Sequence, residues 1–245
     1  MNKEYLEFLS GKNVAIVGPA NYLSKLKLGS YIDEFDVVVR VNRGMELLDR
    51  YPESLGARTD ILYNCLIDSL DNGGVVDIDF YKERGVKWVS TIPNSKPTGE
   101  CSSPDLHKMV NKKNVKAIKK NFNFHVMDHV EYNTLNGVVK CRSNTGYAAI
   151  FDLLSYGIES IFVCGYSFYL DSFISGYKDG CKRSDEEFAA QCFESKRHVQ
   201  KTQWEFLKRI RANDDMISCD PVLESILKME ELSRDAFQEN NIYTN

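Results

Sequence analysis

The chain has 245 residues, of which 43% are hydrophobic and 27% charged, a composition typical of a folded globular protein. This length is enough for one substantial α/β domain with a buried core and argues against two full-sized domains with separate functions. The net charge of -4 argues against a broad nucleic-acid-binding surface. We therefore expect residues 1–245 to form a single domain, and the charge argues weakly against nucleic acid as a partner.

The seven cysteines are scattered and include no Cys-x-x-Cys pair. This pattern speaks against a zinc or dithiol site and predicts reduced thiols in a cytoplasmic protein. No apolar run approaches the ~20 residues of a membrane-spanning helix. The charged, amphipathic first residues do not resemble a secretion signal. We expect a cytoplasmic location and no membrane span.

Short β-branched runs alternate with longer segments whose apolar residues recur about every 3.6 positions. This alternation predicts an α/β fold of the Rossmann-like type, with a mostly parallel twisted sheet flanked by helices. The predicted strands cover residues 13–17, 36–41, 59–63, 86–91, 123–127, 160–164 and 215–218. The predicted helices cover residues 45–51, 75–84, 103–120, 145–156, 198–212 and 221–231.

In two segments the apolar residues do not recur at a regular spacing. Residues 166–192 mix aromatic, small and charged side chains, and we expect them to form an irregular lid near the site. Residues 233–245 are expected to be a loosely ordered tail.

Asparagines follow three of the predicted strands: Asn21, Asn42 and Asn64. Because the carboxyl ends of neighbouring parallel strands meet at one edge, we expect these amides to converge on a crevice. There they would offer neutral donors and acceptors to a base and a ribose. Gly18, at the end of the first strand, either lets a ligand approach the backbone or serves packing alone. No Gly-x-Gly-x-x-Gly pattern follows, which argues against a nicotinamide or flavin cofactor.

A polar segment stands at the start of the apolar helix predicted for residues 145–156: Arg142, Ser143, Asn144, Thr145 and Gly146. A helix amino terminus presents free N–H groups and a favourable dipole to an anion. The segment therefore predicts a seat for a phosphate or carboxylate. Its hydroxyl and amide groups also suit an ordinary helix cap, and the two roles are compatible.

These residues together carry a resemblance to known enzymes. Residues 14–60 resemble the large sialyl motif of glycosyltransferase family 29, in Gly18, Asp33, Asp36, Arg40-x-Asn42 and Gly56-x-Arg58-Thr59. Residues 144–146 and 161–166 are similar to the small sialyl motif of that family. Residues 165–169, Gly-Tyr-Ser-Phe-Tyr, also resemble bacterial sialyltransferases of family 42. The resemblance implies an inverting, metal-independent transferase that uses a cytidine monophosphate (CMP) sugar donor and no cofactor.

The resemblance also implies roles for single residues. Asn21, Asn42 and Asn64 would contact the nucleotide, with Thr145 and Gly146 near the donor and Arg142 on the phosphate. Tyr169 and Tyr177 would donate hydrogen bonds to the departing phosphate. His198 would be the general base for the acceptor hydroxyl, which belongs to a glycan or another molecule. The number of residues between His198 and Glu205 in the sequence fits family 42 better than family 29.

Other functions remain open from the sequence. Asp77-Ile78-Asp79 is an Asp-x-Asp sequence, which holds a divalent ion in many nucleotide-sugar transferases, but its place at a helix start fits capping. The chain could be a non-catalytic nucleotide-binding module. It could also use a different donor, such as a cytidine-linked keto-deoxy sugar, or modify nucleic-acid bases. The sequence does not predict the oligomeric state.

Overall fold

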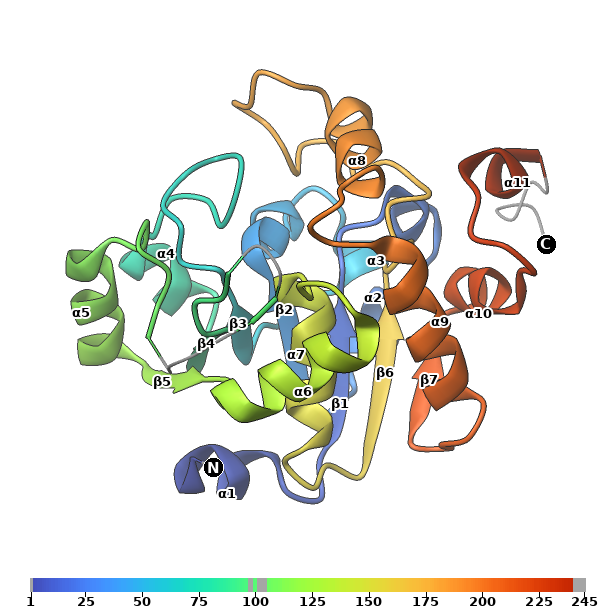
Figure 1. Ribbon diagram of the computed structural model, residues 1–245. Helices are drawn as coiled ribbons and strands as arrows, with labels where there is room; N and C mark the ends of the chain where they lie inside the picture. Colours follow the sequence, from blue (N-terminus) through green and yellow to red (C-terminus); the bar gives the residue numbers. More distant parts are fainter. Residues whose placement is uncertain (1, 97–98, 101–104, 240–245) are drawn as a thin grey trace.

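A computed structural model describes residues 2–96, 99–100 and 105–239. Its centre is a seven-stranded sheet in the order β5-β4-β3-β2-β1-β6-β7 (Figure 1). Every neighbouring pair of strands is parallel. The strands are β1 Asn13–Val17, β2 Val37–Val41, β3 Ile61–Tyr63, β4 Trp88–Thr91, β5 Asn123–Val126, β6 Ser160–Cys164 and β7 Ile217–Cys219.

The helices divide between the two faces of the sheet. The chain runs from β1 to β5 in one direction and from β6 to β7 in the other, so right-handed crossovers place the later helices on the opposite face. In Figure 1, α6 and α7 lie in front of the strands. The helices are α1 Lys3–Leu9, α2 Gly29–Asp33, α3 Pro52–Leu55, α4 Ile78–Glu83, α5 Lys112–Asn121, α6 His129–Val139, α7 Thr145–Leu154, α8 Asp185–Phe193, α9 Gln200–Arg211, α10 Pro221–Lys228 and α11 Arg234–Glu239.

The sheet centre is apolar, as expected for parallel strands covered on both faces. All five residues of β2 are buried, including Arg40, whose side chain is 1% exposed. Its guanidinium donates hydrogen bonds to the carbonyl oxygens of Leu55 and Arg58 at 2.5 Å and 3.1 Å. Burial lowers the pKa of Arg40 to about 10. Arg40 thus ties β2 to the turn that leads into β3 from inside the core.

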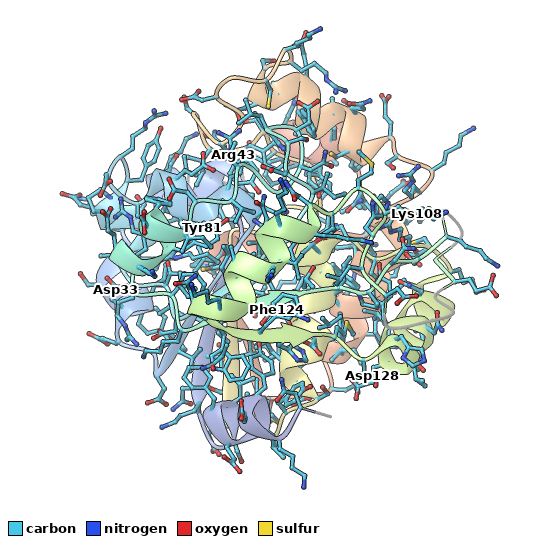
Figure 2. The ribbon with its side chains drawn as sticks, turned by 90° about the vertical axis from the view of Figure 1, so that its left-hand side faces the viewer. Asp33, Arg43, Tyr81, Lys108, Phe124 and Asp128 are labelled. Atoms are coloured by element: carbon cyan, nitrogen blue, oxygen red, sulfur yellow. The ribbon has the colours of Figure 1, made fainter. Side chains whose placement is uncertain are left out.

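The β5 edge is covered by a charged helix. Figure 2 views the molecule from this edge, with Phe124 of β5 at the centre. The ammonium of Lys119 on α5 lies 5.0 Å from the centroid of the Phe124 ring. A basic side chain over an edge strand discourages pairing with another chain.

All seven predicted strands are present, with ends that differ by at most two residues. The α-helix expected at residues 45–51 is wrong, because the short 3-10 helix η2 Asn42–Leu47 takes its place. The helix expected at 103–120 begins only at Lys112, and residues 103–104 lie outside the described residues. Helix α6 was not predicted. The tail expected from residue 233 contains helix α11.

The missed helices have local reasons to form. Asp128 accepts hydrogen bonds from the N–H groups of Val130 and Glu131 and so begins α6. Ser184 and Glu187 form a reciprocal capping box that begins α8. None of the helices in the described part of the chain combines the length and the apolar character needed to cross a membrane.

Strands β1 and β6 end in a close backbone contact. The N–H of Gly18 donates to the carbonyl of Cys164 at 2.8 Å, and that of Ala20 donates to Gly165 at 3.0 Å. A Cβ on either Gly18 or Gly165 would overlap the carbonyl oxygen of the other glycine. Gly165 also has a φ of 72°, in the left-handed region. Only glycine fits at both positions.

This contact predicts a large cost for Gly165→Ala. We expect it to lower the free energy of unfolding by about 3 kcal/mol or more, since steric overlap adds to backbone strain. Gly85→Ala is the matched control, because Gly85 has a φ of 73° and open space around it. Its strain alone costs about 1 to 2 kcal/mol. Urea unfolding measures both, and equal losses would contradict the packing role.

Candidate active site

A pocket of about 570 Å³ opens at the carboxyl edge of the sheet. Residues that follow β1, β2, β3, β4 and β6 line it, together with the residues at the start of α7. Strands β1 and β6 are neighbours whose connections leave in opposite directions. In an open α/β sheet, ligands bind where the strand order reverses in this way. The pocket therefore lies where the fold places a binding site.

The amino terminus of α7 forms one wall of the pocket. Asn144 caps the helix, and its side chain accepts a hydrogen bond from the N–H of Tyr147 at 2.9 Å. Arg142, Ser143, Thr145 and Gly146 all line the pocket. The Nε of Arg142 and the hydroxyl of Ser143 are buried without a hydrogen-bond partner in the described part of the chain. Free helix N–H groups and these donors together favour an anion.

Helix α6 holds this wall in position. The side chain of Asn136 accepts a hydrogen bond from the N–H of Ser143 at 2.8 Å. The hydroxyl of Tyr132 donates to the carbonyl of Ser143, also at 2.8 Å. Both α6 side chains are buried. The polar segment before α7 is therefore fixed from beneath rather than left as a free loop.

His198 also lines the pocket and contacts the segment before α7 directly. Its Nδ1 is 2.6 Å from the carbonyl oxygen of Arg142. A carbonyl only accepts hydrogen bonds, so Nδ1 carries the proton and Nε2 has a free lone pair. Burial lowers the pKa of His198 to about 4, and the nearby charges of Arg142 and Arg197 act in the same direction. The imidazole is therefore neutral at pH 7 and able to accept a proton.

Comparison with known proteins identifies the family. The model of glycosyltransferase family 29 (sialyltransferase) matches residues 7–151, more than half of the chain. The chain belongs to glycosyltransferase family 29. It is accordingly a glycosyltransferase. No curated protein sequence matches the chain significantly.

Solved sialyltransferases are among the structures similar to this chain. CstII from Campylobacter jejuni, in complex with the substrate analogue cytidine-5′-monophosphate, is 16% identical over 86% of this chain and 80% of that chain, with a TM-score of 0.50. A mammalian sialyltransferase in complex with Gal-β-1-3GalNAc-ortho-nitrophenol is 16% identical over 87% of this chain and 71% of that chain, with a TM-score of 0.42. The likeness to CstII shows that the two chains have a similar fold.

The predicted phenols of this family 29 enzyme both line the pocket. Tyr169 has a φ of 61° and follows Phe168, which has a φ of 52°. Two successive left-handed residues other than glycine are strained, and such strain gathers at functional sites. Tyr177 stacks on Phe173 with ring centroids 4.9 Å apart. Burial raises the pKa of both phenols, so both remain protonated and able to donate.

Only one of the three predicted amides lines the pocket. Asn42 does, with a left-handed φ of 47°, and its oxygen accepts a hydrogen bond from the N–H of Cys65 at 3.0 Å. Asn64 instead folds its own loop, because its amide donates to Gly73 at 2.8 Å and accepts from Leu66 at 2.7 Å. Asn21 begins the 3-10 helix η1 Asn21–Lys25 and does not line the pocket. The predicted convergence of three amides is therefore incorrect.

Two other features have structural roles. Gly18 lies beneath the pocket floor in its contact with Gly165 and does not line the cavity. Asp77 caps α4, where its oxygen accepts from the N–H groups of Asp79 and Phe80 at 3.1 Å and 3.0 Å. Neither acid of this Asp-x-Asp sequence lines the pocket. The capping interpretation of Asp77 is confirmed.

The segment expected to be an irregular lid is irregular only as far as Ser184, because the remainder belongs to α8. It contributes pocket residues from Tyr166 to Cys192. Sequence reasoning assigned no role to Tyr166, whose hydroxyl donates to the carbonyl of Gly146 at 3.1 Å. It also missed Lys178, a buried cation at the pocket. That the segment opens and closes remains a prediction.

The environment of His198 predicts an unusual titration. We expect its imidazole NMR signals to titrate with a midpoint near pH 4, because burial disfavours the charged form. Signals that disappear in His198→Asn identify the residue. The lowered pKa also means that this group's contribution to stability is complete above pH ~6.5 and is lost as the pH falls towards 4. A midpoint near 6.5 would show an exposed imidazole instead.

Proposed function

We propose that this enzyme transfers a sialic-acid-like sugar from a CMP-sugar donor to an acceptor hydroxyl, with inversion and without a metal ion. The observation that carries the proposal is the hydrogen bond between His198 and the Arg142 carbonyl. It fixes the tautomer whose Nε2 can act as a base, at a wall built from a helix amino terminus. A base and an anion seat on one pocket are the two parts that this transfer needs.

The donor would bind along the carboxyl edge of the sheet. Asn42 lines the pocket beside β2, and its Nδ2 would donate to a base or ribose oxygen. The amino terminus of α7, with Arg142, Ser143 and Thr145, suits a phosphate or carboxylate. Support for a cytidine nucleotide comes from the family and from the fold shared with CstII, which was solved with CMP.

The chemical step is a single displacement at the anomeric carbon. The acceptor oxygen forms its bond from one side of the sugar while the bond to the phosphate oxygen breaks on the other. The electron pair of that bond leaves with CMP, and Nε2 of His198 takes the hydroxyl proton. Attack opposite the leaving group inverts the configuration.

The leaving phosphate would be stabilised by donors rather than by an ion. Tyr169 and Tyr177 are protonated because burial raises their pKa values, so each can donate to a phosphate oxygen. The acceptor is a hydroxyl of a glycan or of another molecule that reaches His198. The Tyr169 ring packs edge-on against Phe173, with centroids 5.7 Å apart, which positions the phenol before the donor arrives.

Nucleotide specificity is tested by thermal unfolding. CMP at about 100 times its dissociation constant should add about 2.7 kcal/mol of stability, because it binds the folded state alone. We expect a larger rise in melting temperature with CMP than with uridine or adenosine monophosphate at the same concentration. Equal shifts for all three would leave the cytidine assignment without support.

The base is tested by His198→Ala. We expect transfer from CMP-sialic acid to fall by about 10²- to 10⁴-fold, while CMP binding measured by calorimetry changes little. His129→Ala is the control, because His129 does not line the pocket. The assays are run with and without a chelator, and wild-type transfer should be the same in both. Full activity of His198→Ala would end the assignment of the base.

A further inference from the structure

Lys178 is a buried cation at the pocket that the proposed mechanism leaves unused. It directly follows Tyr177, lines the pocket and is 6% exposed. Lysine is almost never so deeply buried unless its charge is paired. Its surroundings therefore need an explanation.

The contacts of the Lys178 ammonium are with neutral groups. It donates one hydrogen bond, to the carbonyl oxygen of Asp71 at 2.8 Å. Aromatic rings surround it, with centroids at 4.0 Å for Phe188, 5.3 Å for Tyr177 and 5.6 Å for Phe173. Within the described residues, no carboxylate forms an ion pair with it. With one hydrogen bond from the ammonium among the described residues, two of its three donor positions remain for a ligand.

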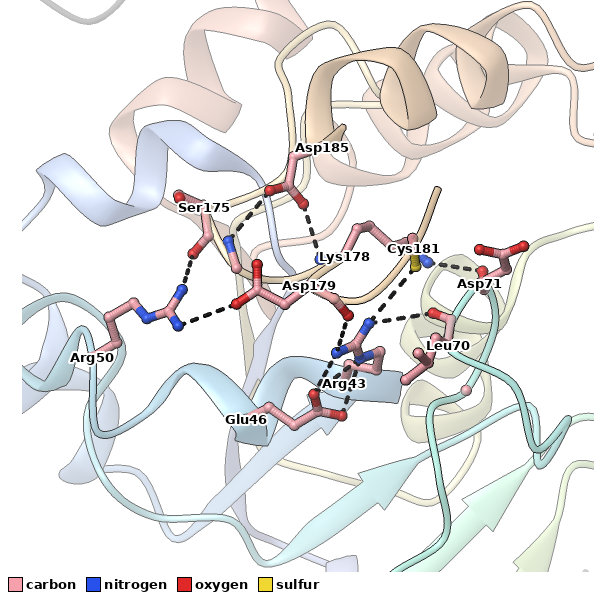
Figure 3. A network of polar contacts seen from close by, with 12 residues as sticks. Arg43, Glu46, Arg50, Leu70, Asp71, Ser175, Lys178, Asp179, Cys181 and Asp185 are labelled. Atoms are coloured by element: carbon pink, nitrogen blue, oxygen red, sulfur yellow. Dashed lines mark hydrogen bonds and ion pairs between the residues drawn. The ribbon is translucent and has the colours of Figure 1, made fainter. Parts of the chain in front are cut away.

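Hydrogen bonds and an ion pair hold the turn that carries Lys178 in place (Figure 3). The carboxylate of Asp185 accepts hydrogen bonds from the N–H groups of Gly176 and Lys178 at 3.3 Å and 3.0 Å. Arg50 donates to the carbonyl of Ser175 at 3.2 Å and pairs with Asp179 at 3.2 Å. The backbone of Lys178 is thereby held against the pocket.

Buried Arg43 completes this support. It pairs with Glu46 at 2.7 Å, and its guanidinium donates to the carbonyls of Asp179 and Leu70 at 3.1 Å and 3.3 Å. Arg43 thus joins η2, the loop after β3 and the turn of Lys178. These contacts connect three segments near Lys178. They limit the movement of its side chain towards solvent.

Such a position is costly in the empty protein. Removing an ammonium from water without a partner charge is unfavourable, and burial lowers the pKa of Lys178. A methionine of similar length would fill the same aromatic surroundings without that cost. The cost falls when an anion enters the pocket and pairs with the ammonium.

We propose that Lys178 binds the phosphate of the nucleotide donor and pairs with the charge that develops on it as the sugar departs. This inference rests on the proposed function. A CMP-linked sialic-acid-like donor has two anionic groups, a phosphate and a carboxylate. The pocket has two positive regions, one at the start of α7 and one at Lys178. The ammonium of Lys178 lies 5.3 Å from the centroid of the Tyr177 ring, so a phosphate held by the Tyr177 hydroxyl would lie near both groups.

The test compares a charged and an uncharged probe, CMP and cytidine, by calorimetry. Lys178→Met removes the charge and keeps the aliphatic length, whereas Lys178→Arg keeps a charge. Lys182→Met is the matched control, since Lys182 is exposed in the same segment and does not line the pocket. We expect Lys178→Met to weaken CMP about tenfold or more and to leave cytidine unchanged. Lys178→Arg and Lys182→Met should retain the preference for CMP over cytidine.

A melting curve without ligand separates this role from a structural one. Lys178→Met should melt at the same or a higher temperature than the wild type, because it removes a buried charge that has no ion-pair partner among the described residues. A lower melting temperature, or an equal loss of CMP and cytidine affinity, would mean that Lys178 serves packing and would overturn the inference. So would unchanged CMP binding in Lys178→Met.

The same measurements separate a failure of the proposed function from a failure of the role of Lys178. If the wild type prefers uridine monophosphate to CMP and Lys178→Met abolishes that binding, the donor assignment fails and the role of Lys178 stands. If the wild type binds CMP and Lys178→Met binds it equally well, the reverse holds. If the wild type binds neither nucleotides nor inorganic phosphate, both fail.

Discussion

The contact between the backbones of Gly18 and Gly165 decides where the pocket lies. It brings β1 and β6 together at their carboxyl ends, after which the chain leaves to opposite sides. Tyr166, the next residue along, donates its hydroxyl to Gly146 and so connects the strand end to α7. A Cβ on Gly146 would come within 3.1 Å of that hydroxyl. The helix amino terminus thus reaches the cleft because three glycines permit close approach.

The residues that carry the family resemblance mainly stabilise the sheet and the turns between its strands. Asp33 accepts hydrogen bonds from the N–H groups of Ala57 and Arg58 at 2.8 Å and 3.0 Å. Arg58 in turn pairs with Asp60 at 3.0 Å. With buried Arg40, they fix the entry of β2 and β3 into the sheet. A motif match therefore predicts where the strands end more directly than it predicts which side chains touch a substrate.

This distinction explains how far the sequence could predict the site. Buried β-branched runs indicate strands, so the pocket edge was predictable, and Asn42, Thr145 and His198 do line one pocket. A sequence does not reveal where a side chain turns after its strand ends. Asn64 turns back into its loop, and only tertiary structure shows this. Lys178 lies in a segment whose apolar residues do not recur at a regular spacing. No sequence pattern there distinguishes a buried lysine from an exposed one.

Several features that disfavour folding gather at the pocket, at the edge of a sheet whose strands are largely apolar and buried. Phe168 and Tyr169 have left-handed backbones, His198 is shifted toward its neutral form, and the charge of Lys178 is buried. All four follow β6, on connections that a rigid parallel sheet supports. Donor binding would use three of them: the phenol of Tyr169, the free imidazole nitrogen of His198 and the ammonium of Lys178. Local instability at these positions is thus an argument for preorganisation, since a site shaped only for stability would contain none of them.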